Sequence, residues 1–161
     1  MNLLIQPYNF SISNIFFLDM KENTIMNGNF IKFIYSTDMI TLNGLFLDFT
    51  ILEPEQKIYN GKQYLFFPTD LNEENDKTII LFERIETELL DLFIQLQLSK
   101  NNREILNKKK IHTIHKQLTN GMIKYYNYSD NTSVTPKYYM KISGIWETAN
   151  EIGLTYKLIQ Y

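Results

Sequence analysis

The stretch KYYMKISGIWETANEIGLTYKLIQ, residues 137–160, holds the clearest strand pattern in the chain. Aromatic and β-branched residues are enriched in 137–147 and again in 151–160, and the short segment 148–150 between them predicts a hairpin. Because side chains alternate along a strand, the first of these strands has two different faces. The face expected in the core holds Tyr138, Met140, Ile142 and Trp146, and the face expected in solvent holds Lys137, Tyr139, Lys141 and Ser143.

Other segments before this hairpin also have strand patterns, separated by turn signals. Asn27-Gly28 predicts a turn, Asn43-Gly44 predicts either a hairpin turn or a bulge, and Asn60-Gly61 predicts a tight hairpin. A loop is expected over 129–136, ended by Pro136. The predicted strands are 10–18, 30–37, 40–52, the two arms of 57–67, and 122–128.

In the middle of the chain the apolar spacing changes. Within TIILFERIETELLDLFIQLQL, residues 78–98, apolar residues recur every three or four positions, which predicts a helix with one apolar stripe. A second, basic helix is predicted over 103–118, and Asn120-Gly121 is a suitable end for it. The stripe of the first helix consists of Phe82, Ile85, Leu89, Leu92 and Leu96.

This order of elements predicts one α+β, mostly β domain over residues 1–161. A helix between an N-terminal meander and three C-terminal strands is the order of an OB-like barrel, in which a helix covers one end. A split α+β sandwich has the same order, so the order alone does not choose between the two.

Composition narrows the class of protein. Hydrophobic residues make up 44% of the 161 residues and charged residues 21%, which is typical of a globular domain and excludes general disorder. The absence of cysteine excludes disulfides and thiolate chemistry. The chain has 21 Ile, 17 Asn and 14 Lys but one Ala, one Val and two Arg, a bias that indicates an AT-rich genome. The start MNLLIQPYNF does not look like a secretory signal, and no apolar run approaches the ~18–20 residues of a membrane span, so we expect an intracellular protein without a membrane partner.

Charge is distributed unevenly although its sum is only −2. Residues 1–99 carry 6 basic and 14 acidic side chains, whereas residues 100–161 carry 10 basic and 4 acidic ones. Such an asymmetry marks a polyanion-binding surface in some proteins, and in others the charges mix again on the folded surface.

No residue pattern indicates catalysis. His112 and His115 would share one helix face, but a metal site needs three or four ligands, and an exposed histidine pair is the simpler interpretation. The carboxylate pair Glu73-Glu74 lies in an acidic helical region, and no phosphate-binding glycine loop or nucleophile elbow is present. We therefore expect a protein that is not an enzyme and uses no cofactor and no metal.

The late strands combine lysines with tyrosines. Lysine neutralises phosphates, and flat rings stack on unpaired bases for roughly 1–3 kcal/mol per base, so this mixture is typical of surfaces that bind single-stranded nucleic acid. With only two arginines, base-specific reading of a duplex is less favoured. The alternative is that these are ordinary strand residues enriched by an AT-rich genome. The candidate nucleic-acid-binding residues are Lys32, Lys124, Lys137, Lys141 and Lys157 for phosphates and Tyr126, Tyr128 and Tyr139 for bases.

Two segments carry a resemblance to a known family. KYYMKISGIWETANEIGLTYKLIQY (137–161) resembles the C-terminal end of small proteins of large nucleocytoplasmic DNA viruses, and FIKFIYSTDMITLNGLFL (30–47) resembles their N-terminal strand pair. The most specific pieces are KISGIWE (141–147) and GLTYK (153–157). Those viral proteins in turn are similar to the OB-fold single-stranded DNA-binding proteins of podoviruses.

The resemblance implies an OB-fold, cooperative binding of single-stranded DNA, and a role in viral DNA replication, recombination or repair. It implies a ligand surface that includes Lys141 and Lys157, with replication proteins or further copies of the chain as partners, in the host cytoplasm or viral factory, the nucleus or the virion. RNA is the alternative ligand. The podoviral proteins end in an acidic tail that recruits replication enzymes, whereas this sequence ends in LTYKLIQY, which puts that recruitment in doubt.

A second hypothesis keeps the viral context but assigns a different role. In it, the chain is a structural or assembly protein, such as a minor virion component, and the apolar stripe of helix 78–98 docks on a partner.

Overall fold

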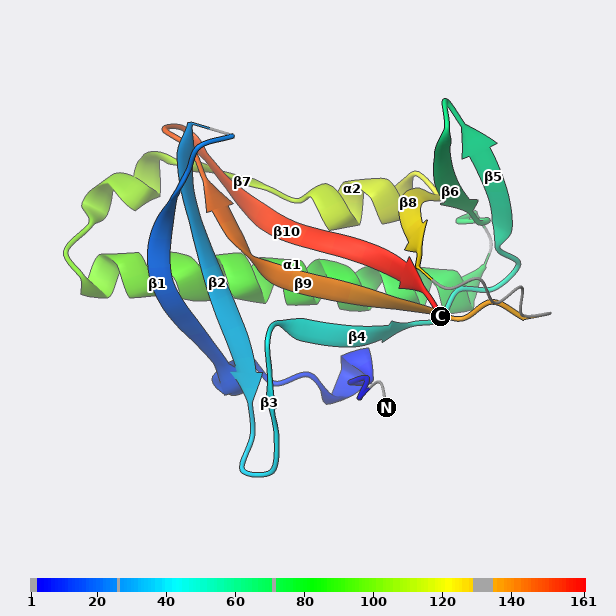
Figure 1. The fold of residues 1–161 in the computed structure, drawn as a ribbon, viewed down its shortest axis with the longest axis horizontal. Coiled ribbons are helices and arrows are strands. Elements are labelled where there is room, and N and C mark those ends of the chain that lie inside the picture. The colour runs from blue at the N-terminus through cyan, green and yellow to red at the C-terminus, as the bar shows by residue number, and fades with distance from the viewer. Residues whose placement is uncertain (1–2, 26, 71, 129–134) are drawn as a thin grey trace.

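The computed structural model describes residues 3–25, 27–70, 72–128 and 135–161. It shows an α+β fold in which a long helix, α1 (Glu73–Ser99), lies behind one large mixed sheet (Figure 1). The strands are β1 (Ile15–Asn23), β2 (Gly28–Ser36), β3 (Thr41–Leu42), β4 (Leu45–Phe49), β5 (Glu55–Tyr59), β6 (Lys62–Phe66), β7 (Lys109–Ile111), β8 (Met122–Asn127), β9 (Tyr138–Glu147) and β10 (Glu151–Gln160).

The predicted C-terminal hairpin is confirmed, and it forms the centre of the sheet. The main path of hydrogen-bonded strands is β1-β2-β9-β10-β8-β6-β5. Along the edge that faces away from β9, β10 pairs in parallel with both β7 and β8. Every other strand pairing in the sheet is antiparallel. The path has two ends, β1 and β5, so the sheet is open and the closed OB-like barrel is not confirmed.

Asn43-Gly44 makes neither the hairpin turn nor the bulge that the sequence predicts. β3 pairs with β2, and after Gly44 the chain crosses to pair with β9 as β4. β2 and β4 therefore share one edge of β9, β2 at residues 144–147 and β4 at 138–142. Gly44 has φ +109°, and a Cβ there would lie 2.9 Å from the carbonyl oxygen of Ile142, so only glycine fits this crossing.

A β-bulge in β9 corrects the predicted core face. Thr155 of β10 pairs with Gly144 and Tyr156 pairs with Ile142, so Ser143 is an extra residue. Up to Ile142 the alternation is as predicted, with Tyr138, Met140 and Ile142 buried. Beyond the bulge the parity reverses: Ile145 is buried instead, and the Trp146 ring lies over Gly153, where a Cβ would come within 2.4 Å of it. The prediction that Trp146 lies in the core was wrong for this reason.

The predicted helix 78–98 is confirmed as α1 but begins earlier, at Glu73, with the Asn72 side chain as its N-cap. Phe82, Ile85 and Leu89 are fully buried as predicted, whereas Leu92 and Leu96 are only half-buried. The predicted stripe follows a 3.5-residue repeat, which drifts around a helix of 3.6 residues per turn. Further along the helix, Leu90, Phe93 and Gln97 face the core in place of Leu92 and Leu96.

The second predicted helix, 103–118, was mostly wrong. Residues Arg103–Asn107 form a 3-10 helix, Lys109–Ile111 form β7, and only Thr113–Thr119 form an α-helix, α2. β7 exists because it pairs with Glu151–Gly153 of β10, a long-range contact that local spacing does not show. The predicted helix end at Asn120-Gly121 is confirmed, with φ +65° at Gly121.

The remaining strand predictions are confirmed with shifted bounds. The first strand starts at Ile15, because Ile12–Asn14 form a 3-10 turn, and it continues to Asn23 before the turn that precedes Gly28. The β5–β6 hairpin turns through Asn60 and Gly61, both with positive φ (49° and 71°), as a two-residue loop requires. Most of the predicted loop 129–136 lies outside the described residues.

A buried carboxylate attaches α2 to α1. Glu86 is 0% exposed, and it accepts hydrogen bonds from the backbone N–H groups of Ile114 (3.1 Å) and His115 (2.9 Å) in the first turn of α2. The N-cap residue His112 makes no side-chain cap of its own, so Glu86 fills that role from another helix. Burial raises the pKa of Glu86 above its usual value, and the two backbone donors offset only part of that effect.

Replacing Glu86 by glutamine should change how stability depends on pH. Because the folded protein holds the Glu86 proton more tightly than the unfolded chain does, this group stabilises the fold most at low pH, and the stabilisation is lost as the pH rises through the raised pKa. From about pH 4 upward, the free energy of unfolding of the wild type should therefore fall relative to that of Glu86→Gln. Urea unfolding of both proteins at a series of pH values measures this difference.

Glu88→Gln is the matched control, since Glu88 is a more exposed carboxylate on the same helix. Glu88→Gln should not reproduce the change that Glu86→Gln causes. A difference between wild type and Glu86→Gln that stays constant across the pH series would contradict the prediction.

Candidate functional site

Three lysines from three adjacent strands form one row on the side of the sheet opposite α1. Lys141 of β9 is directly opposite Lys157 of β10. In the parallel pairing of β10 with β8, Leu158 is opposite Tyr125, so Lys157 and Lys124 are the adjacent positions one residue earlier. Lys141, Lys157 and Lys124 are called the lysine row below.

Within the part of the chain that the structure describes, the lysine row has no neutralising partner. Among the described residues, no carboxylate lies within ion-pair distance of any of its three ammonium groups. The ammonium groups lie over aromatic rings instead: those of Lys124 and Lys157 are 4.5 Å and 5.0 Å from the centroid of Tyr126, and that of Lys141 is 5.2 Å from the centroid of Phe46. Like charges directly opposite one another destabilise a sheet, so this arrangement is suited to an anion that bridges the row.

Aromatic rings lie beside the lysine row on the same face. Tyr126 and Tyr128 are stacked, with centroids 6.2 Å apart and an interplanar angle of 7°. Tyr139 lies between Phe46 (6.1 Å) and Tyr161 (5.6 Å). Burial raises the pKa of the Tyr139 hydroxyl, and the nearby Tyr128 adds to the effect. The set Tyr126, Tyr128, Tyr139 and Tyr161 is called the tyrosine cluster below.

The rings of this cluster differ in how open they are to a ligand. Tyr128 is 68% exposed, whereas Tyr126 and Tyr139 are half-buried and one side of the Tyr126 ring faces two ammonium groups. Tyr128 therefore offers the freest ring face for stacking.

Six of the eight candidate residues from the sequence meet in this site: Lys124, Tyr126, Tyr128, Tyr139, Lys141 and Lys157. Of the other two, Lys137 lies at the end of the site beside Tyr161, and Lys32 lies apart. Lys32 is exposed on β2, opposite Gly144, on the same side of the sheet but beyond the bulge. Lys137 is exposed just before β9, where its carbonyl accepts a hydrogen bond from the backbone of Tyr161.

Sequence reasoning missed Phe46 and Tyr161. Phe46 alternates with the buried residues Leu45 and Leu47, so strand parity alone indicates that its ring faces away from the core. Its position opposite Lys141 depends on the β4–β9 pairing, which no local pattern shows. Tyr161 follows the same parity as Lys157, but it comes after the end of the predicted strand.

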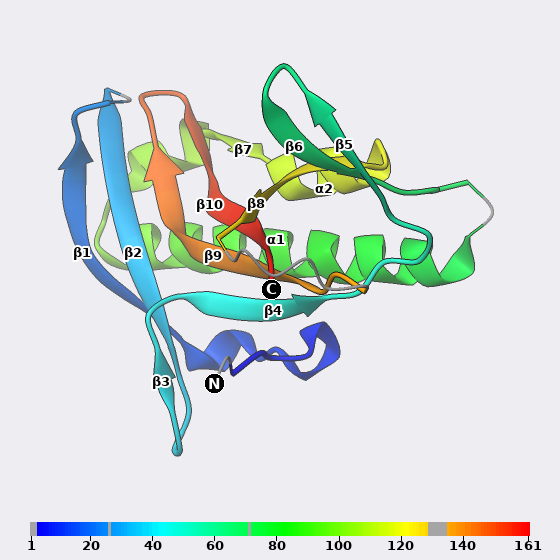
Figure 2. The ribbon, with the colours of Figure 1, turned by 45° about the vertical axis from the view of Figure 1, so that its right-hand side comes forward.

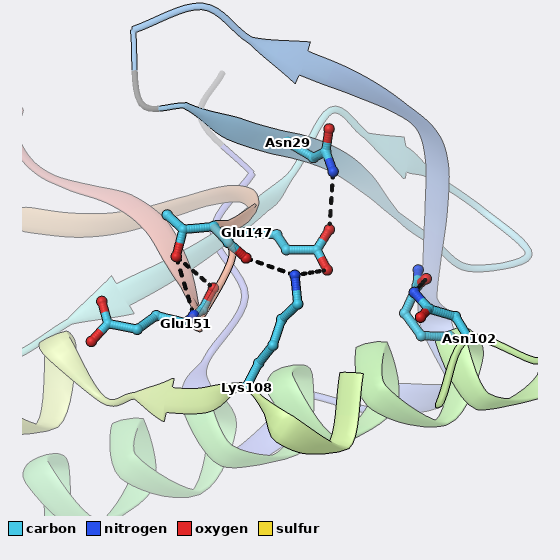
Figure 3. Close-up of polar contacts among 7 residues, drawn as sticks. Asn29, Asn102, Lys108, Glu147 and Glu151 are labelled. Atoms are coloured by element: carbon cyan, nitrogen blue, oxygen red, sulfur yellow. Dashed lines mark hydrogen bonds and ion pairs between the residues drawn. The ribbon is translucent and has the colours of Figure 1, made fainter. Parts of the chain in front are cut away.

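Other lysines of the basic half are already neutralised. Lys108 contacts Glu147 at 2.8 Å and donates to the Thr148 carbonyl at 2.6 Å, and Asn29 donates to the second oxygen of Glu147 at 3.3 Å (Figure 3). Glu147 is only 4% exposed, so this ion pair fixes the far end of the β9–β10 hairpin. Lys110 contacts Asp91 at 2.7 Å. Lys108 and Lys110 are therefore held in ion pairs within the fold.

The two histidines lie at different places at the start of α2. His112 is the N-cap residue of α2, and His115 lies in its first turn with Nδ1 at 3.5 Å from Glu83. Within residues 3–25, 27–70, 72–128 and 135–161, no group of three or more His, Cys, Asp or Glu side chains is placed to hold a metal ion. No helix in the same ranges is long and apolar enough to cross a membrane.

Comparison of the chain with protein-family models, with curated proteins and with solved structures found no match in any of the three. The resemblance to the viral proteins and their single-stranded DNA-binding relatives therefore depends on the residues that carry it. DNA binding stays a prediction.

Removing one charge from the lysine row should stabilise the free protein. Lys157 faces Lys141 and Lys124, so Lys157→Gln relieves like-charge repulsion on both sides and should raise the free energy of unfolding at low salt by about 0.2–1 kcal/mol. Salt screens such repulsion, so the gain should shrink as the ionic strength rises. Urea unfolding at two salt concentrations measures both effects.

Lys116→Gln, at an exposed lysine of α2, is the control and should give no such gain. Equal stability of wild type and Lys157→Gln at low salt would show that the row carries no net repulsion.

Proposed function

We propose that this protein is a non-catalytic single-stranded DNA-binding protein and that the face formed by the lysine row and the tyrosine cluster is its binding surface. The observation that carries the proposal is the lysine row itself: three lysines on adjacent strands, opposite one another and without a carboxylate partner among the described residues. A polyanion with regularly spaced charges would relieve their repulsion. A single sulfate or a monocarboxylate has too few charges to bridge all three lysines.

The neighbouring rings favour nucleic acid over other polyanions. Unpaired bases stack on aromatic side chains, whereas the bases of a duplex are already stacked on one another. The open face of Tyr128 and the position of the tyrosine cluster beside the row match a ligand whose bases all project to one side of its phosphates. The shortage of arginine argues against base-specific reading of a duplex.

The viral part of the proposal depends on the sequence resemblance. Under it, the chain acts in viral DNA replication, recombination or repair, and its open sheet is a distant variant of the OB barrel. The rival assembly role has less of the α1 stripe available for docking, because Phe82, Ile85 and Leu89 are buried. Only Leu92 and Leu96 of the stripe are partly exposed.

Neutralising two lysines of the row should weaken DNA binding. In Lys124→Gln/Lys157→Gln the affinity for a fluorescent oligothymidylate at low salt should fall by roughly tenfold or more, and the slope of log affinity against log salt should flatten by about 0.7 for each phosphate that the variant no longer neutralises. Fluorescence anisotropy at several salt concentrations measures both. Lys100→Gln, at an exposed lysine just after α1, is the matched charge control and should bind like wild type.

A wild-type affinity that does not change with salt would rule out binding through the lysine row. Inorganic polyphosphate serves as a competitor without bases. If it displaces the oligonucleotide as well as unlabelled oligothymidylate does at equal phosphate concentration, the surface binds polyanions in general and the nucleic-acid proposal fails.

Tyr128→Ala tests the stacking contribution separately. Loss of one stacked base costs roughly 1–3 kcal/mol, so the affinity should fall about fivefold to 150-fold while the salt slope stays as in wild type. Tyr8→Ala is the control, because Tyr8 is 67% exposed against 68% for Tyr128 but lies in the N-terminal 3-10 turn. Equal affinities of the two variants would remove Tyr128 from the binding surface.

A further inference from the structure

We propose that the binding path continues beyond β8 onto the β5–β6 hairpin, where Tyr64, Lys57 and Phe66 bind a further stretch of the same DNA strand. This inference depends on the proposed function, because it extends the same surface. It assigns a binding role to a hairpin for which the sequence predicted the structure but no function.

Strand register places the hairpin residues in line with the lysine row. Lys124 of β8 is opposite Tyr64 of β6, and Tyr64 is opposite Lys57 of β5. At the other end of the row, Lys141 is opposite Phe46 of β4. The line across the sheet reads Phe46, Lys141, Lys157, Lys124, Tyr64, Lys57.

The hairpin side chains belong to the same face as the lysine row. Leu65 is fully buried and is opposite the buried residue Ile123, so its neighbours Tyr64 and Phe66 face the other way. The Lys57 ammonium lies over the Phe66 ring, 4.8 Å from its centroid. This contact repeats the arrangement of Lys124 and Lys157 over Tyr126.

The line is long enough for an extended ligand. It crosses six neighbouring strands, and adjacent strands are about 4.8 Å apart, so its ends are roughly 24 Å apart before twist is considered. Figures 1 and 2 show the β5–β6 hairpin projecting from the body of the sheet beside β8. A ligand that follows the line therefore runs across the strands and leaves the sheet along the hairpin.

One acidic residue competes for the hairpin lysine. Lys57 contacts Glu55 at 2.9 Å, and both side chains are more than half exposed (54% and 69%). An exposed ion pair of this kind contributes little to stability, so a phosphate can replace the carboxylate at small cost. The pair gives two substitutions with opposite expected effects on the same contact.

The experiment compares two oligothymidylates of roughly 4 and roughly 16 nucleotides, the lower and upper ends of the range of single-domain sites. At about 3.4 Å per nucleotide, the shorter one spans roughly the 10 Å between Lys141 and Lys124 and does not reach the hairpin. Lys57→Gln should weaken binding of the longer one and flatten its salt slope by about 0.7, with no change for the shorter one, which the lysine row accommodates. Glu55→Gln should tighten binding of the longer one. Tyr64→Ala should also weaken only the longer one, with its folding checked by circular dichroism.

Lys77→Gln and Glu74→Gln are the matched controls. They alter another exposed lysine–glutamate pair, 2.6 Å apart, at the start of α1, and should leave both affinities unchanged. If Lys57→Gln and Glu55→Gln bind the longer oligonucleotide like wild type while Lys124→Gln/Lys157→Gln is weakened, the hairpin is not part of the path and the proposed function stands. If wild type binds neither oligonucleotide at low salt, the proposed function itself fails.

Discussion

The extra residue at Ser143 decides what each half of β9 presents to solvent. Before the bulge, Tyr139 and Lys141 face away from α1, and after it Gly144 and Trp146 do. A bulge re-aims side chains in this way because it shifts the alternation by one residue. Gly144 follows directly, and a Cβ there would lie 2.3 Å from the carbonyl oxygen of Ile31, so β2 can approach only because that residue is glycine. The bulge thus separates a polar half of β9, which belongs to the proposed binding surface, from an apolar half that pairs with β2.

Lysine has two distinct uses in this molecule. Lys108 is a largely buried partner of Glu147 and holds the turn of the β9–β10 hairpin against the segment before β7. Lys124, Lys141 and Lys157 are surrounded by rings and by one another. Net charge by chain half does not separate these uses, because both kinds occur in residues 100–161. The separation follows from which strand lies beside which.

Strand parity could predict the faces of individual strands. It placed Tyr139 with Lys141, and Lys124 with Tyr126 and Tyr128, and the structure confirms both groupings.

Parity could not predict that β8 lies beside β10. The two strands are parallel and β9 intervenes between them in sequence, so no turn residue marks their pairing. The bulge was equally hidden, since Ser143 reads as one more member of a regular alternation. The same holds for Lys109–Ile111. Its local sequence predicts a helix, but its parallel pairing with β10 makes it strand β7.

The position of β8 in turn depends on the helix layer. α2 leads directly into β8 through Gly121, whose N–H bonds to Leu118 and whose carbonyl accepts from Phe67 at the end of β6. A Cβ at Gly121 would lie 2.5 Å from the Phe67 carbonyl oxygen, so this junction has no room for a side chain. Glu86 holds the start of α2 against α1, and α2 ends at Thr119, shortly before β8 begins at Met122. A carboxylate buried on one side of the sheet thereby positions the strand that presents Lys124 and Tyr126 on the other side. The stability of the α1–α2 contact is therefore coupled to the geometry of the face that we propose binds DNA.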